Sequence, residues 1–135
     1  MISLNGKHAL VSGGSRGIGA ATAMLLAQAG ADVGIAYRSR HAEADAVVGA
    51  IRALGRRAFA YAADLSLVEA NDAFVQRGCD EFGGVDIFVG NSGVWPPVPV
   101  AVETLGDLRW RSTLALNLDG MFFADDSVYF GVLGI

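Results

Sequence analysis

A glycine-rich turn, "SGGSRGIG" (residues 12–19), is the first stretch of this sequence whose residues could do chemistry. An apolar run precedes the turn and an alanine-rich stretch follows it. Glycine lets a main chain approach a ligand closely because it has no Cβ, and the first turn of a helix presents N–H groups to an anion. The stretch therefore predicts an anion site between a strand and a helix. The alternative is a tight connection without a ligand.

The spacing of the glycines distinguishes between the known types of phosphate-binding turn. A P-loop needs lysine after its last glycine, whereas Ala20 follows Gly19. The pattern G-x-G-x-x-G starting at Gly17 would need a third glycine where Thr22 stands. What remains is G-x-x-x-G-x-G, beginning at Gly13, in the strand–turn–helix context that suits the pyrophosphate of a dinucleotide.

The segments around this turn alternate between two kinds of periodicity. Short apolar runs are typical of buried strands, and apolar residues at helical spacing lie between and after them. Such alternation indicates right-handed βαβ crossovers and a parallel sheet covered on both faces. The predicted fold class is therefore α/β, a Rossmann-like doubly wound parallel sheet truncated after about four strands. The expected strands are 7–12, 32–37, 57–62 and 85–90, and the expected helices are 17–29, 41–54, 66–82 and 103–123.

Local signals predict where some of these elements begin and end. Ser66, with Glu69 three residues later, predicts a capping box at the start of the third helix. Gly30 and the pair Gly83–Gly84 predict the ends of the first and third helices. Three prolines make 94–101 a loop.

Four ordered stretches resemble the classical short-chain dehydrogenases/reductases. "SGGSRGIG" resembles the cofactor loop of that family, with Ser12 in place of the usual threonine. "ADLS" (63–66) resembles the family's adenine-binding turn, and "GNSG" (90–93) its Asn-Asn-Ala-Gly segment. "LNLDGMFF" (116–123) resembles the segment with the active-site asparagine. The resemblance covers residues 1 to about 124 and so only the N-terminal, cofactor-binding half of the family.

This resemblance implies a role for each matching position. Asp64 would accept a hydrogen bond from the adenine amino group, with the Leu65 main chain beside the ring, and Asn117 would be the catalytic asparagine. Gly90 departs from the family because it replaces the first asparagine of its segment. The implied cofactor-binding residues are Gly13, Ser15, Arg16, Gly17, Ile18, Gly19, Arg38, Ser39, Asp64, Leu65, Asn91, Ser92 and Gly93.

The end of the second strand indicates which dinucleotide is bound. NAD-binding folds commonly place an acidic residue there to accept from the ribose 2′-hydroxyl. This chain has Tyr37, followed by Arg38 and Ser39. A guanidinium can pair with a 2′-phosphate through charge-assisted hydrogen bonds, and Arg16 could add a second positive charge. We therefore expect NADP rather than NAD; the alternative is that both arginines are solvated surface residues.

The catalytic part of the family pattern is missing from the sequence. Family members pair a tyrosine with a lysine four residues later, which lowers the pKa of the tyrosine, and the substrate is a small-molecule carbonyl or alcohol. The single lysine of this chain is Lys7, and the residues four positions after Tyr37, Tyr61 and Tyr129 are not lysine. Two hypotheses follow. One is an NADP-dependent oxidoreductase recorded as a shortened chain; the other is a dinucleotide-binding module without catalysis, or the remnant of an interrupted reductase gene.

The last residues form a distinct segment in this interpretation. Residues 1–124 are assigned to the NADP-binding domain and 125–135 to a divergent apolar tail. Asp125 and Asp126 oppose the macrodipole at a helix C-terminus and suggest an early helix end. Residues 128–133, "VYFGVL", are then expected to pair beside the fourth strand as a substitute fifth strand; unrelated sequence is the alternative.

Composition excludes several other classes. The chain has 135 residues, 53% of them hydrophobic, and a net charge of −4, so we expect one globular domain and no nucleic-acid partner. One cysteine and two distant histidines predict neither a disulfide nor a metal site. No membrane segment and no secretory signal stand out, which fits a cytoplasmic protein. A homo-oligomer is left open, because one of the two helices through which family members pair is missing.

Overall fold

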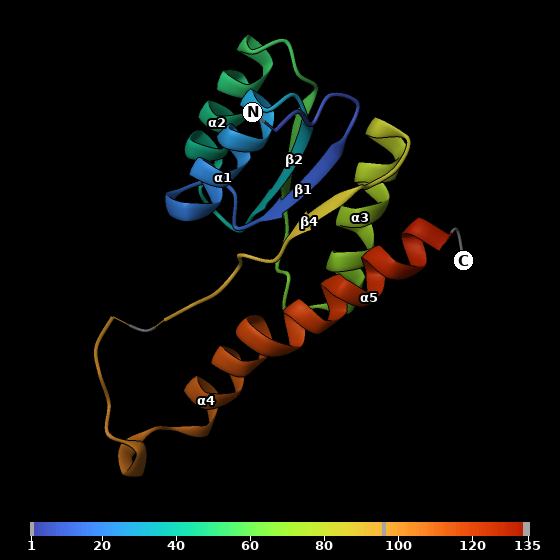
Figure 1. Cartoon of the computed structure of the whole chain (residues 1–135). Coiled ribbons are helices and arrows are strands. Elements are labelled where there is room, and N and C mark those ends of the chain that lie inside the picture. Colours follow the sequence, from blue (N-terminus) through green and yellow to red (C-terminus); the bar gives the residue numbers. More distant parts are fainter. Residues whose placement is uncertain (1, 96, 134–135) are drawn as a thin grey trace.

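The protein is a parallel four-stranded sheet with helices on both faces (Figure 1). The computed structural model describes residues 2–95 and 97–133. The strand order is β3-β2-β1-β4, and each neighbouring pair is parallel. The strands are β1 (His8–Ser12), β2 (Asp32–Tyr37), β3 (Ala58–Ala62) and β4 (Ile87–Val89). The α/β prediction and its four strands are confirmed.

Two helices and a hydrophobic core cover each face of the sheet. Helices α1 (Gly17–Gln28) and α2 (His41–Ala53) pack on one face, and α3 (Val68–Phe82) and α5 (Gly120–Leu133) lie together on the other (Figure 1). Ile35 and Ile51 are fully buried in the first core, and Leu10 and Phe74 in the second. Burying each such side chain contributes roughly 1.5–3 kcal/mol. These two cores hold β1 and β2 rigidly between them.

The register of the strands brings four chain turns to one edge of the sheet. Ser12 pairs with Ala36, Val11 with Val89, and Tyr37 with Ala62. In a parallel sheet the carboxyl ends of all strands lie at the same edge. The glycine turn after β1 therefore lies beside the residues that follow β2, β3 and β4, which is where open α/β sheets bind ligands.

The third helix begins differently from the expectation. Helix α3 starts at Val68 after Leu67, and no side chain caps it, so the predicted capping box is wrong. The Ser66 hydroxyl instead donates to Asp64 Oδ1 at 2.7 Å, and the Ser66 N–H donates to the same oxygen at 3.0 Å. The predicted helix ends are confirmed, since Gly30 and Gly83 follow α1 and α3 with φ of 110° and 91°.

The chain after β4 differs most from the prediction. In place of one helix over 103–123, a 3₁₀ turn (Val102–Thr104) precedes α4 (Asp107–Leu114), and the π-helical turn η2 (Ala115–Asp119) leads directly into α5. We call residues 97–114 the arm, because they extend away from the sheet in Figure 1. No residue of α4 is buried, and the Leu108 side chain is 83% exposed.

The predicted substitute fifth strand is wrong, because residues 128–133 belong to α5. The helix continues across position 124, so Asp125 and Asp126 lie on its exposed side rather than at its end. Ala124 is fully buried, and Ser127 Oγ lies 2.7 Å from Asp72 Oδ1 on α3. Packing against α3 at helical spacing therefore outweighs the apolar run that favoured a strand.

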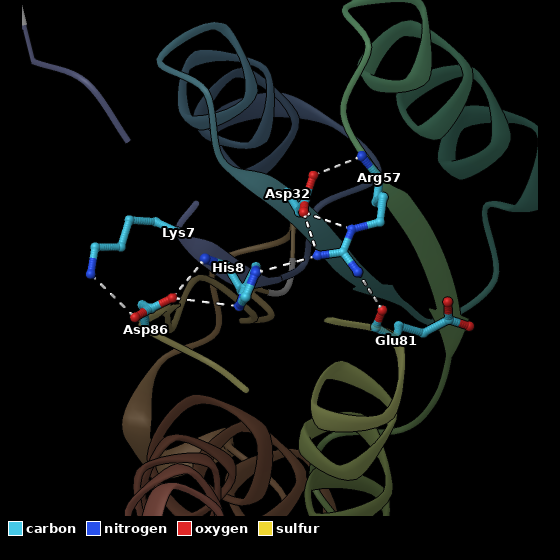
Figure 2. Close-up of polar contacts among 6 residues, drawn as sticks. All are labelled: Lys7, His8, Asp32, Arg57, Glu81 and Asp86. Atoms are coloured by element: carbon cyan, nitrogen blue, oxygen red, sulfur yellow. Dashed lines mark hydrogen bonds and ion pairs between the residues drawn. The ribbon is translucent and has the colours of Figure 1, made fainter. Parts of the chain in front are cut away.

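A polar network closes the opposite, amino-terminal edge of the sheet (Figure 2). Arg57 Nε and Nη2 lie 2.8 and 2.7 Å from Asp32 Oδ2, and Arg57 Nη1 donates to the Glu81 carbonyl at 2.9 Å. Asp86 accepts from the His8 N–H at 2.9 Å and pairs with Lys7 at 3.4 Å. These side chains join β1, β2, β3 and the segment before β4, so they serve the fold.

Candidate functional site

A cleft of about 430 Å³ opens at the carboxyl edge of the sheet. Its walls come from the four turns that follow the strands and from Leu116 in η2. All the cofactor-binding residues predicted from the sequence line it except Gly19. The lining residues are Gly13, Ser15, Arg16, Gly17, Ile18, Tyr37, Arg38, Ser39, Arg40, Ala63, Asp64, Leu65, Asn91, Ser92, Gly93, Val94 and Leu116.

The glycine turn aims the start of α1 at this cleft. Gly13 and Gly17 adopt φ of 64° and 56°, a region that side chains with a Cβ rarely occupy. Arg16 is the N-cap residue and makes no side-chain capping bond; the first helical bond runs from the Ala20 N–H to the Arg16 carbonyl at 3.2 Å. The N–H groups of a first helical turn have no acceptor within their own helix. They carry a partial positive charge toward the cleft.

Gly19 lies beneath the turn rather than on the cleft wall. It is buried, and a Cβ at this position would collide with the Gly13 carbonyl oxygen and lie 2.6 Å from Asn91 Nδ2. The absence of a side chain at Gly19 therefore lets α1 approach the end of β1 and the turn after β4. The residue shapes the site without lining it.

Ser12 ties the turn after β1 to the turn after β4, a role that the sequence analysis did not predict. Its fully buried Oγ accepts hydrogen bonds from the N–H groups of Asn91 at 2.8 Å and Ser92 at 2.9 Å. Asn91 Nδ2 in turn donates to the Gly13 carbonyl at 3.2 Å. These bonds fix the distance between the two turns, although Gly90 lacks the asparagine side chain that the family has at this position. The sequence signal for this role was a serine at the last position of a predicted strand.

Arg38 and Asp64 lie side by side in the cleft lining, after the neighbouring strands β2 and β3. Arg38 Nη2 lies 3.8 Å from Asp64 Oδ2, and the Arg38 side chain is 69% exposed. Hydrogen bonds from the Ser66 hydroxyl and N–H lower the pKa of Asp64, and the charge of Arg38 acts in the same direction. The site thus holds a carboxylate fixed at one oxygen and an exposed cation beside it.

Tyr37 is a cleft residue that the sequence analysis did not assign to the site. Its hydroxyl lies 2.6 Å from His41 Nδ1, and the two rings meet edge to face. Arg40, also missed, lines the same wall and pairs with Glu43 at 3.3 Å. The corner after β2 therefore gathers two guanidinium groups near the N-terminus of α2. In the sequence, the run of polar residues after Tyr37 was the signal for this corner of the cleft.

Asn117 lies in the π-helical turn η2, next to the cleft rather than within its lining. Its Oδ1 accepts from the Val94 N–H at 2.7 Å, and its Nδ2 donates to the Val94 carbonyl at 2.8 Å. Both neighbours, Val94 and Leu116, line the cleft. The side chain thus holds the loop after β4 against η2. Turns of this kind inside helices are frequent at functional sites.

The comparison with known proteins decides the family of this fold and cleft. A family model described as short chain dehydrogenase matches residues 7–129. This chain belongs to the short-chain dehydrogenase family. It is 45% identical over 128 residues to the hydroxynaphthalene reductase of Aspergillus fumigatus, covering 95% of this chain and 46% of that protein. It is 36% identical to the 3-oxoacyl-[acyl-carrier-protein] reductase of a Synechocystis species, with coverages of 95% and 51%.

Solved short-chain dehydrogenases share the architecture. The crystal structure of a short-chain dehydrogenase from Burkholderia cenocepacia in complex with NADP superposes with a TM-score of 0.91 at 42% identity. The match covers 96% of this chain and 52% of that one. The chain thus spans about half the length of the relatives it matches.

The single lysine and the tyrosines of this short-chain dehydrogenase chain do not meet. Lys7 lies at the amino-terminal edge of the sheet, paired with Asp86, at the far end of β1 from the cleft (Figure 2). Tyr61 packs against Phe74 in the core, and Tyr129 lies on α5. Only Tyr37 reaches the cleft, where His41 is its partner.

Neither a metal centre nor a membrane-spanning helix is found in the described part of the chain. Over residues 2–95 and 97–133, no three side chains of His, Cys, Asp or Glu gather in a way that could hold a metal ion. Within the same part of the chain, the helices are too short or too polar to cross a bilayer.

Proposed function

We propose that the chain binds a nicotinamide dinucleotide in the cleft and prefers NADP to NAD. The observation that supports this most strongly is the convergence of the α1 N-terminus and the Arg38 guanidinium on one cleft. A helix N-terminus suits a pyrophosphate, and a guanidinium suits a further phosphate group. The backbone cradle at Gly13 and Gly17 fits such a group, because both residues line the cleft without a side chain.

Each wall of the cleft has its own part in this proposal. Main-chain N–H groups between Gly13 and Gly19 bind the pyrophosphate, together with Ser15 and Ile18. Arg38, Ser39 and Arg16 bind the 2′-phosphate. Asp64 and Leu65 bind the adenine, and Asn91, Ser92 and Gly93 border the nicotinamide end.

The whole family protein would act as an oxidoreductase on a small-molecule carbonyl or alcohol. When bound, the nicotinamide supplies or accepts the hydride. The names of the two reductases to which this chain is similar support carbonyl reduction. In this chain Asn117 would hold the loop at Val94 and keep one lone pair and one N–H for a water molecule, since its two bonds to Val94 use one of each.

A second candidate function is a dinucleotide-binding module without turnover. The observation that favours it is the position of Lys7, whose ammonium pairs with Asp86 at the opposite edge of the sheet from the cleft. The tyrosine–lysine pair that the family uses as its acid and base cannot be assembled from these 135 residues.

The experiment is a titration of the 135-residue chain with NADPH and NADH, followed by an assay of carbonyl reduction over a broad substrate panel. We expect saturable binding of NADPH at lower concentration than NADH. Binding without turnover would support the module, and reproducible turnover would support the oxidoreductase. A folded chain that binds neither coenzyme would contradict the proposed function.

A further inference from the structure

The turn between β3 and α3 carries two of the proposed adenine contacts without being part of a strand or helix. Asp64 and Leu65 line the cleft from residues 63–67, which separate Ala62 from Val68. Within the turn, Asp64 accepts from Ser66, and the Leu67 N–H donates to the Asp64 carbonyl at 3.2 Å. These local bonds shape the turn but do not attach it to the rest of the molecule.

The Ala63 N–H attaches the start of the turn to β2 by donating to the Tyr37 carbonyl at 2.9 Å, and Asn71, in the first turn of α3, attaches its middle. Its side chain is 1% exposed, and its Nδ2 lies 2.9 Å from both the Leu65 and the Leu67 carbonyl oxygens. A carboxamide has two N–H donors on this nitrogen, so one group can bond both oxygens. Asn71 thereby fastens the cleft-lining turn to the buried face of α3.

The opposite side of the turn is fastened by α5. A Cβ at Gly120 would lie 2.5 Å from the Leu65 carbonyl oxygen, so the helix backbone approaches this oxygen closely. The Leu65 carbonyl therefore points between two helices, and the Asn71 amide is its hydrogen-bonding partner. A shift of that bond would move Leu65 and Asp64 in the cleft together.

Asn71 satisfies the turn at the expense of one of its own atoms. Its Oδ1 is buried, and among the described residues no hydrogen-bond partner faces it. An apolar side chain of similar size would remove this unpaired acceptor but would leave the Leu65 carbonyl without its donor. The benefit of asparagine at this position lies in the two bonds that it makes to the turn.

We propose that Asn71 is a positioning residue for the adenine end of the cofactor, acting through the turn at 64–67. This inference rests on the proposed function, because it needs a dinucleotide in the cleft. Asn71 touches no cofactor atom itself, since it does not line the cleft. Its effect is to hold the Asp64 carboxylate and the Leu65 main chain where an adenine ring can meet them.

The test is a double-mutant cycle with Asn71→Leu and Asp64→Ala, read as NADPH affinity by fluorescence titration below the melting temperature of each variant. We expect Asn71→Leu to weaken NADPH about tenfold, the effect of losing one well-placed interaction. In the Asp64→Ala background the same change should cost less than about threefold, because coupled residues are not additive.

Val48→Ala on α2 is the matched control for lost stability. Val48 belongs to the core on the other face of the sheet, so its truncation lowers the melting temperature without touching the turn. We expect unchanged NADPH affinity. Asn71→Thr is the second variant, should Asn71→Leu not fold. Its hydroxyl can bond the Leu67 carbonyl four residues earlier but does not replace the bond to Leu65, so an intermediate loss is expected.

The outcomes separate the two proposals. Unchanged NADPH affinity in the Asn71 variants, or an equal loss with and without Asp64, overturns the positioning role while leaving cofactor binding intact. A wild-type chain that binds neither coenzyme overturns the proposed function and the positioning role with it. A coupled loss that the Val48→Ala control does not show supports both.

Discussion

The two edges of the same sheet use arginine in opposite ways. At the amino-terminal edge, the Arg57 guanidinium pairs with Asp32 and donates to the Glu81 carbonyl (Figure 2). It also lies 5.2 Å from the centre of the Phe82 ring. At the carboxyl edge, Arg38 has one ion pair within the described residues, at 3.8 Å to Asp64. The fold supplies partners to all three nitrogens of the first guanidinium, whereas the second keeps donors for a ligand.

This difference shows how to distinguish a structural charge from a binding charge on one scaffold. Both arginines stand next to short apolar runs in the sequence, Arg57 before one and Arg38 after one, and both are more than half exposed. What separates them is the number of acceptors that tertiary structure brings within reach. Changes at the carboxyl edge should therefore alter cofactor affinity, and changes at the amino-terminal edge should alter stability.

The largest effect is expected from Gly19→Ala at the carboxyl edge. The added Cβ would collide with the Gly13 carbonyl and press on Asn91 Nδ2, so the turn and its N–H groups must move. Hydrogen bonds to charged groups contribute roughly 1.5–3 kcal/mol each, so losing two would weaken NADPH more than about 100-fold. Fluorescence titration with NADPH measures this loss.

Gly49→Ala on α2 is the control for this change. Nothing lies within 4 Å of a Cβ at Gly49, and alanine in a helix interior is more stable than glycine by roughly 0.5–1 kcal/mol. NADPH affinity should stay at the wild-type value. Normal affinity in Gly19→Ala would contradict the proposed pyrophosphate site.

Arg38→Asp should come next in size and should act selectively. Loss of a charge-assisted bond to the 2′-phosphate, and its replacement by a repulsive charge, should weaken NADPH by about 10- to 100-fold. NADH lacks that phosphate, so its affinity should change less than about threefold. Arg111→Asp on the arm makes the same charge change away from the cleft and should leave both affinities unchanged. Equal losses for both coenzymes in Arg38→Asp would contradict the 2′-phosphate assignment.

Arg57→Ala tests the amino-terminal edge. It removes the pairing with Asp32, the bond to the Glu81 carbonyl and the contact with the Phe82 ring. We expect the free energy of unfolding to fall by about 1–3 kcal/mol in chemical denaturation, with NADPH affinity unchanged. Glu81→Gln, which keeps the carbonyl and loses only the surface pairing with Arg77, should cost at most about 0.5 kcal/mol. A loss of cofactor affinity in Arg57→Ala would break the distinction between the two edges.

The smallest effect is expected at Asp86, as a dependence of the free energy of unfolding on pH. The His8 N–H lowers the pKa of this carboxyl, and the charge of Lys7 adds to the shift. A lowered folded-state pKa means that the stabilisation is present above the unfolded-state pKa and is lost as pH falls through the folded-state value. Asp86→Asn should therefore cost at most about 1 kcal/mol at pH 7. The difference from wild type should shrink as pH falls below the ordinary pKa of aspartate and disappear once the folded-state carboxyl is protonated. Chemical denaturation at several pH values measures it; a constant difference would reject the ion pair as the cause.

The sequence predicted those parts of the molecule whose signals are local. The glycine turn, the four strand runs and the positions of Arg38, Asp64 and Asn91 follow from short patterns, and the structure brings these residues to one cleft. The predictions that were wrong concern Ser66, the single helix over 103–123 and the tail from Asp125 to residue 133. The tail depended on a partner distant in the sequence, because α5 packs on α3. At Ser66, a bond to Asp64 two residues earlier replaced the predicted cap.

By itself, then, the sequence determined the α/β class, the family and the identity of most cleft residues, because strand–turn–helix order and glycine spacing are short-range properties of the chain. Tertiary structure alone decided which arginine finds its acceptors within the fold, and that the tail is a helix held through Ala124 and Ser127. Those outcomes depend on which groups meet across elements. Hydrogen bonds and packing between distant segments leave no mark in the local periodicity of either one.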